Sequence, residues 1–279
     1  MMIDTAPARP ARARPRRKPM LLRRKVVRRI LPVLVIVGFF LLWEVVVRLF
    51  QIQSFVLPAP SAILASMVEW HQVILLAAWQ TFLTTIIGFA IAVVFGLAIG
   101  TAIGSSPVLY DAIYPALIGF NSIPKVAVVP ILVIWFGIGM VPAIITAFLI
   151  SFFPIMVNVA TGIATVEPEL RDVLRALGAK QHQVVLKVGL PRAMPYFFAS
   201  LKIAISVAFV GSILAETVAS DSGIGHLMLV ASSRFEVPLA FAGLMMTAAM
   251  GIVLYLVAVA IEQRMTGWAT RGGGFSAEP

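Results

Sequence analysis

Long apolar stretches alternate with short polar ones along most of this chain. A helix needs roughly 20 apolar residues to cross a bilayer core about 30 Å thick. Each stretch that approaches this length predicts a membrane-spanning helix: Ile30–Phe50, a segment within Ile74–Gly104, Val108–Gly137, Val141–Ala164, Tyr196–Thr217 and Leu239–Ile261. We therefore expect an all-α, polytopic membrane protein with about six transmembrane helices.

The third of these stretches is interrupted by the sequence "NSIPK" at Asn121–Lys125. A broken helix within a membrane is tolerated only where it is buried in protein or lines a cavity. Ionisable groups in a span are functional candidates by default. Asn121 and Lys125 are therefore candidates for a translocation pathway, in which a cation and free backbone donors suit an anion. Snorkelling or a structural ion pair is the alternative for Lys125. For Asn121 and Asn158 we expect hydrogen bonds to neighbouring helices.

Composition supports lipid as the solvent of this protein. Hydrophobic residues make up 60% and charged residues 12% of the 279 positions, against roughly 45–50% and 25% in soluble domains. There is no cysteine, and the three histidines lie far apart in the sequence. We therefore expect no disulfide, metal or cofactor site, and no catalytic constellation of an intramembrane enzyme.

Basic residues are unevenly distributed around the expected spans. Of the 22 Lys and Arg residues, 11 lie in positions 1–29, five in the loop at about 165–193 and two after position 261. With six spans these 18 share one side, and the opposite side holds only Arg234. Cytoplasmic flanks carry an excess of Lys and Arg, so we expect both termini in the cytoplasm. The charge belongs to a tail, which argues against nucleic-acid binding.

These patterns divide the chain into four parts. We expect a basic, disordered cytoplasmic tail at 1–29, then a first transmembrane helix with an extracytoplasmic loop at 30–73. A helical core follows at 74–261 and contains the polar cytoplasmic loop at about 165–193. A cytoplasmic C-terminal tail occupies 262–279.

The polar loop predicts an amphipathic helix from Pro168 to Leu177. Pro fits the first helical position, and Glu169 places negative charge at the positive end of the helix dipole. Gly178 follows, a residue that can take the positive φ of a helix stop. Four apolar residues fall at i, i+3, i+4 and i+7, which makes one stripe: Leu170, Val173, Leu174 and Leu177.

A second short helix is expected after Gly178, with Val184, Val185 and Val188 on one face. Pro191 should end that helix, and Pro195 should open the next span. An apolar stripe outside the membrane needs a partner, either the lipid headgroups or a groove of another protein. The absence of aromatic residues from the stripe favours a protein partner.

The same loop resembles the EAA loop of ABC importer permeases. The resemblance rests on the pattern "E-L-x-D-x-x-R-x-L-G-A" from Glu169 to Ala179, including Asp172 and Arg175, with Leu190-Pro191 after it. Asp172-Val173-Leu174 depart from the Glu-Ala-Ala that the family often has. Three further segments are similar to the nitrate/sulfonate/taurine-type branch of the family, so that the resemblance covers about residues 81–268: Leu109–Gly139, Phe152–Gly162 and Ala215–Met228.

This resemblance implies a type I ABC importer permease in the bacterial inner membrane, importing a small anion such as a sulfonate, taurine or nitrate. The implied partners are two ATPase subunits, a second permease copy and an extracytoplasmic solute-binding protein. The chain has no GxxxxGK[ST] phosphate loop, so ATP and Mg would bind the ATPase. The implied coupling residues are Glu169, Leu170, Asp172, Val173, Leu174, Arg175, Leu177, Gly178, Ala179 and Pro191.

The segment "SDSGIGHLM" at Ser220–Met228 lies on the expected outer side. Its Gly223 and Gly225 indicate a tight turn leading to a short helix at the gate or at the dock of the binding protein. Glu216 is a further candidate for the pathway or gate. Interfacial solvation of Glu216, and an ordinary loop between spans, are the alternatives. At the level of the whole chain, a self-sufficient secondary transporter or channel would show inverted repeats, and we find none.

Overall fold

The computed structural model describes residues 20–266, apart from the side chains of residues 20–30 and of Pro168. Most of the expected N-terminal tail (1–19) and the segment 267–279 lie outside the described residues. Within 20–266 the chain forms helices and connecting turns without strands, which confirms the all-α prediction. The chain divides into two units, residues 1–52 and 53–279.

The first unit contains a single long helix, α1 (Met20–Leu49). Its segment Leu31–Leu49 is long and apolar enough to cross a membrane. The helix begins at Met20, earlier than the limit at Ile30 expected from the sequence. The residues "LLRRKVVRR" explain the extension, because Leu, Arg and Lys are good helix formers and neither Gly nor Pro interrupts them.

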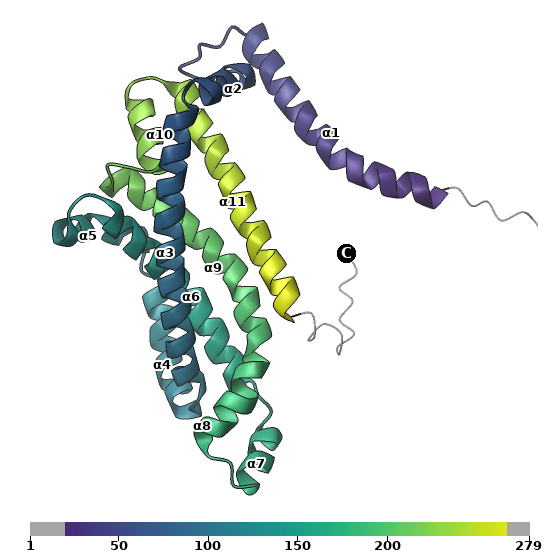
Figure 1. Ribbon diagram of the computed structural model, residues 1–279, viewed down its shortest axis with the longest axis vertical. Coiled ribbons are helices and arrows are strands. Elements are labelled where there is room, and N and C mark those ends of the chain that lie inside the picture. Colours follow the sequence, from purple (N-terminus) through teal and green to yellow (C-terminus); the bar gives the residue numbers. More distant parts are fainter. Residues whose placement is uncertain (1–19, 267–279) are drawn as a thin grey trace, which may run out of the picture. The chain divides into compact units, whose positions relative to one another are not determined.

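The second unit is a bundle of long helices with short helices at its two ends (Figure 1). Helices α7 and α8 lie at one end of the bundle, and α2 and α10 lie at the other (Figure 1). In chain order its elements are α2 (Pro60–Glu69), α3 (His71–Gly104), α4 (Pro107–Asn121), the 3₁₀ turn η1 (Lys125–Val128), α5 (Val129–Phe136), α6 (Met140–Ala164), α7 (Pro168–Ala176), α8 (Gln181–Val184), the π-helical turn η2 (Val185–Gly189), α9 (Leu190–Ala219), α10 (Ile224–Ser233) and α11 (Val237–Thr266).

Among the described residues, five helices are long and apolar enough to cross a membrane, and a bent pair makes a sixth. The bent pair is the expected broken span: α4 ends at Asn121, η1 begins at Lys125, and the two parts meet at 73°. The predicted break is thus confirmed. Pro124 stands just before η1, where its lack of a backbone donor prevents a continuous helix.

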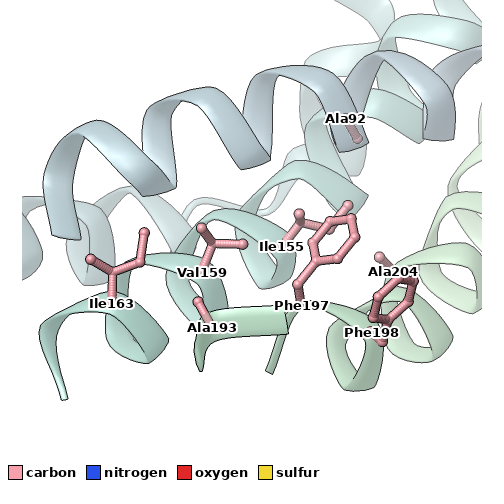
Figure 2. Packing of buried hydrophobic residues seen from close by; sticks show 8 residues of the cluster. All are labelled: Ala92, Ile155, Val159, Ile163, Ala193, Phe197, Phe198 and Ala204. Carbon is pink, nitrogen blue, oxygen red and sulfur yellow. The ribbon is translucent and has the colours of Figure 1, made fainter. Parts of the chain in front are cut away.

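Close packing of α3, α6 and α9 forms the centre of the second unit. Ala92 of α3, Phe197 of α9 and three residues of α6 belong to one buried cluster (Figure 2): Ile155, Val159 and Ile163. The other members of the cluster are on α9: Ala193, Phe198 and Ala204. Burying such side chains is worth roughly 1.5–3 kcal/mol each in water, but inside lipid the close fit itself provides most of the stabilisation.

Three glycines four residues apart let α3 approach α6 closely: Gly96, Gly100 and Gly104. A Cβ atom added at Gly100 would lie 2.6 Å from the carbonyl oxygen of Met156, and one added at Gly104 would lie 2.6 Å from that of Ala160. Real Cβ atoms do not come so near to backbone, so no larger residue fits without separating the helices. Small residues at this spacing are typical of helix pairs in membranes.

The expected helix boundaries at Pro191 and Pro195 are wrong. The chain is helical without interruption from Gln181 to Ala219, so Pro191 lies in the first turn of α9 and Pro195 lies inside it. The π-helical turn η2 ends at Gly189, two residues before Pro191. Its wider turn accommodates the missing proline donor, and such turns commonly relieve a helix at this kind of position.

Candidate functional site

The polar loop forms a helical hairpin turn at one end of the second unit (Figure 1). Helix α7 runs from Pro168 to Ala176, within one residue of the predicted end. Gly178 follows with φ = +84°. Its N–H donates to the Arg175 carbonyl at 2.9 Å, and the Ala179 N–H donates to the Leu174 carbonyl at 3.0 Å. This pair of bonds is a Schellman motif, so the predicted glycine stop is confirmed.

The apolar stripe of α7 has no partner for its outer members among the described residues. Leu170 and Leu174 are half-buried, whereas Val173 is 56% and Leu177 is 79% exposed. The charged side chains lie beside the stripe: Glu169 in the first turn, and Asp172 paired with Arg175 at 3.7 Å. Helix α7 is thus a short amphipathic helix, with apolar side chains on one face and charged side chains beside them.

Hydrogen bonds that were not predicted from the sequence hold the polar loop to the spans. Arg171 donates through Nη2 to the carbonyls of Ile163 and Ala164, the latter at 3.2 Å, and so caps the end of α6. Gln181 of α8 donates to the Ser105 carbonyl at 2.8 Å, beyond the end of α3. These bonds join α7 to the end of α6, and α8 to the end of α3. Only the position of an Arg in the first turns of an amphipathic helix could have suggested this role.

The second group of predicted residues gathers where α9 meets α10. Glu216 is almost fully buried, so the alternative of interfacial solvation does not describe it. Its carboxylate accepts a hydrogen bond from the Gly225 N–H at 3.1 Å. Gly223 lies against the same carboxylate with φ = +92°. Two further donors to this carboxylate, Thr81 and Thr84 of α3, were not predicted from the sequence. The polar residues of "QTFLTT" in an otherwise apolar span were the signal that could have indicated them.

Asn121 and Lys125 form a separate pair at the bend between α4 and η1. Lys125 Nζ donates to the backbone oxygen and to Oδ1 of Asn121, both at 2.7 Å. The ammonium also lies 5.8 Å from the centroid of the Phe153 ring on α6. The expectation that Asn121 and Asn158 bond neighbouring helices is wrong for Asn158, which donates to Pro154 of its own helix at 2.8 Å.

The three groups are thus separate in the fold. The loop residues lie at the α7 end of the second unit and the Glu216 group lies at the α10 end (Figure 1). Pro191 is the exception among the loop residues, since it belongs to the first turn of α9. The second unit is thus a bundle of apolar helices with an amphipathic helix at one end and a buried carboxylate at the other.

Comparison with known families decides the class of the transporter. Residues 92–267 match the model of the binding-protein-dependent transport system inner membrane component. This chain belongs to that family. It is an ABC transporter permease, a multi-pass protein of the inner membrane and a transport subunit that is not an enzyme by itself.

Relatives and solved structures of ABC transporter permeases agree with this membership. A probable ABC transporter permease of Haemophilus influenzae is 31% identical over 81% of this chain and 93% of its own. The riboflavin permease RibX of Chloroflexus aurantiacus is 30% identical over 81% and 85%. The putative aliphatic sulfonates permease SsuC of Bacillus subtilis is 29% identical over 81% and 83%.

The fold of the permease is also found in a solved structure. A chain of the inward-facing MetNI methionine ABC transporter superposes with a TM-score of 0.61, covering 70% of this permease and 97% of that chain at 18% identity. The fold is that of a type I ABC importer permease, which confirms the fold predicted by the resemblance.

Proposed function

We propose that this permease imports a small organic anion by alternating access, driven by ATP hydrolysis in a separate ATPase subunit. The observation that carries the coupling is the exposed apolar stripe of α7, where Val173 and Leu177 are uncovered at the tip of the second unit. Exposed apolar residues on a short helix outside the membrane are typical of a helix that docks in a groove of another protein.

Two copies of the ATPase, which bind ATP and Mg, engage two copies of this permease. An extracytoplasmic binding protein delivers the solute at the opposite, α10 end. Closure of the ATPase pair moves α7, and the bonds of Arg171 pass that movement to α6. Such a rigid-body displacement of packed helices is a common form of switching.

Membership of the family does not specify the solute, so the class of solute is a separate part of this proposal. The relatives compared above are named for riboflavin and for aliphatic sulfonates, and these names belong to those proteins. Lys125 favours an anion for this chain, because its ammonium lies at the break of a span, where a cation is retained only for a structural or functional reason.

Docking of α7 is tested by co-purification of the ATPase subunit with the permease. Leu177→Asp places a charge on the stripe, and an unpaired buried charge costs several kcal/mol. Because Leu177 is 79% exposed in this chain alone, the variant should fold and insert normally yet lose the ATPase. Val108→Asp is the matched control, since Val108 is 78% exposed near the same end but lies on α4.

The outcome separates coupling from lipid binding. Loss of the ATPase in Leu177→Asp, with retention in Val108→Asp, supports the proposal. Normal assembly of both variants would contradict it. Weaker binding of an isolated α7 peptide to anionic vesicles after the same change would then favour the alternative, an interfacial helix on a self-sufficient transporter.

A further inference from the structure

A carboxylate without a cationic partner lies inside the second unit at its α10 end. Glu216 of α9 is 1% exposed, and none of the ion pairs found among the described residues involves it. Burying such a group is costly unless hydrogen bonds satisfy its oxygens. Oε2 accepts from Thr81 Oγ1 at 2.7 Å and from the Gly225 N–H at 3.1 Å, and Oε1 accepts from Thr84 Oγ1 at 3.2 Å.

The same group of side chains caps the start of α10. The first N–H groups of a helix have no partner within it. In α10 they donate to side chains of other helices: Ile224 to Thr81 Oγ1 at 2.8 Å and Gly225 to Glu216. The Gly223 N–H, just before the helix, donates to Gln80 Oε1 at 3.1 Å. The beginning of α10 is therefore fixed to α3 and α9 at once.

Two glycines make this contact sterically possible. A Cβ atom at Gly223 would overlap the carboxylate of Glu216, and φ at Gly223 is +92°. A Cβ atom at Gly225 would lie 2.8 Å from Cβ of Glu216. Close contact with the carboxylate, together with the left-handed backbone at Gly223, requires residues without a side chain at both positions.

The last turns of α9, which carry Glu216, also contact the bent span. Ala215 and Ala219 belong to a buried cluster with Val129 of α5 and Ala143 of α6. The Ala219 carbonyl also accepts a hydrogen bond of 2.9 Å from the Gly139 N–H, in the turn between α5 and α6. The last turns of α9 thus contact both the residues around the carboxylate and the bent span.

We propose that Glu216, Thr81, Thr84 and Gly225 form a clamp. The clamp makes the first turns of α3, the last turns of α9 and the start of α10 move as one body during transport. Glu216 is a positioning residue in this account, and it does not contact the solute. The clamp gives the bent span a fixed surface against which it opens and closes. This inference rests on the proposed function, because it assumes that ATP drives the opening.

Variants of α3 test the clamp with little change of shape. Thr81→Val removes the hydroxyl that joins Glu216 to Ile224, and Thr81→Ser restores it. Thr85→Val is the matched control: Thr81 and Thr85 are both 0% exposed, one turn apart, and the Thr85 hydroxyl has no hydrogen-bond partner among the described residues. A change that depends on the clamp must appear in Thr81→Val alone.

The readout is a single cysteine at Ile138, which is 69% exposed in the turn between α5 and α6. The complex with its ATPase is placed in nanodiscs and labelled with a maleimide, first without nucleotide and then trapped with MgATP and vanadate. We expect the labelling rates without nucleotide and in the trapped state to differ by about fivefold in the parent, in Thr81→Ser and in Thr85→Val. In Thr81→Val the two labelling rates should differ by less than about twofold.

Each outcome is decisive. A parent-like difference in Thr81→Val, or convergence in Thr85→Val, overturns the clamp. A parent that binds the ATPase but shows no difference overturns the clamp and leaves the coupling proposal standing, whereas failure to bind the ATPase overturns both.

Hydrogen exchange of the parent needs no variant. The amides of residues 223–225 should exchange as slowly as those in the middle of α10, and exchange as fast as in an exposed loop overturns the clamp.

Discussion

Arg192 and Glu167 join the two ends of the polar loop, with Arg192 Nη1 2.9 Å from Glu167 Oε2. Glu167 immediately precedes α7, and Arg192 lies in the first turn of α9. Both side chains are at least half exposed, so their ion pair contributes no more than about 1 kcal/mol. Arg171 is half-buried and bonds two carbonyls of α6, so it is the stronger of the two anchors.

Arg171→Met should therefore loosen α7 from α6. Two hydrogen bonds from a charged donor are lost, each worth about 1.5–3 kcal/mol before allowance for solvent at this half-buried site. We expect the ATPase still to co-purify, while solute uptake falls at least about tenfold relative to ATP hydrolysis. Arg175→Met is the control, because Arg175 is exposed and its two partners, Asp172 and Gln181 Oε1, belong to the same loop and not to α6. An equal loss in both variants would contradict the anchoring role of Arg171.

Gly178→Val should distort the turn between α7 and α8 through the backbone alone. The glycine has φ = +84°, and a Cβ atom there would meet nothing within 4 Å. The cost is thus the strain of a β-branched residue in the left-handed region, on the order of 1–3 kcal/mol. Gly178→Asn should be nearly neutral, since Asn tolerates this region. Uptake by purified complexes in proteoliposomes checks both, and equal uptake by the two variants would show that the turn is dispensable.

The sequence predicted this part of the molecule well, because its signals are local. Amphipathic spacing from Leu170 to Leu177, a proline at the start and Gly178 at the end are sufficient to define α7 and its turn. The break at Asn121–Lys125 was predicted for the same reason, since prolines act on their own backbone. Spans were found because lipid requires long uninterrupted apolar helices.

Contacts between distant segments could not be predicted in this way. Thr81 and Glu216 are 135 positions apart, and nothing local pairs them. Continuity through Pro191 was missed because the π-helical turn before it has no local sequence signal; the turn lies where the start of α9 packs against α6. The spacing of Gly96, Gly100 and Gly104 was visible, but their partner helix was not.

Gly100→Ala should separate α3 from α6. The added Cβ atom would lie 2.6 Å from the Met156 carbonyl oxygen and 2.9 Å from Cβ of Val159. Because these are backbone and branched neighbours that cannot turn away, we expect a loss of about 1–3 kcal/mol, as for other overpacked cores. Gly119→Ala is the control, since its Cβ would meet nothing within 4 Å and alanine favours a helix. The thermal unfolding temperature in detergent should fall for Gly100→Ala only. Equal unfolding temperatures of the two variants would contradict the close approach of α3 to α6.

Orientation in the membrane can be tested directly, because the chain has no cysteine. Ser233→Cys lies at the end of α10 and His182→Cys lies in α8, both exposed and at opposite ends of the second unit (Figure 1). The excess of Lys and Arg near α7 and α8 predicts a cytoplasmic position for that end. An impermeant maleimide should label Ser233→Cys in intact cells and reach His182→Cys only after lysis. The reverse pattern would invert the proposed topology.

Lys125→Met should lower the uptake of an anion at least about tenfold if the ammonium lines its path. Lys125 also caps α4 through its two bonds of 2.7 Å to Asn121, and such caps are worth about 1 kcal/mol of stability. The two roles separate in Asn121→Ala, which removes the side-chain acceptor but keeps the cation. We expect Asn121→Ala to reduce thermal stability slightly and to retain uptake, and Lys125→Arg to retain both. Uptake of the solute carried by the binding protein, measured in proteoliposomes, distinguishes them: similar losses in Lys125→Met and Asn121→Ala would assign Lys125 to the helix end rather than to the path.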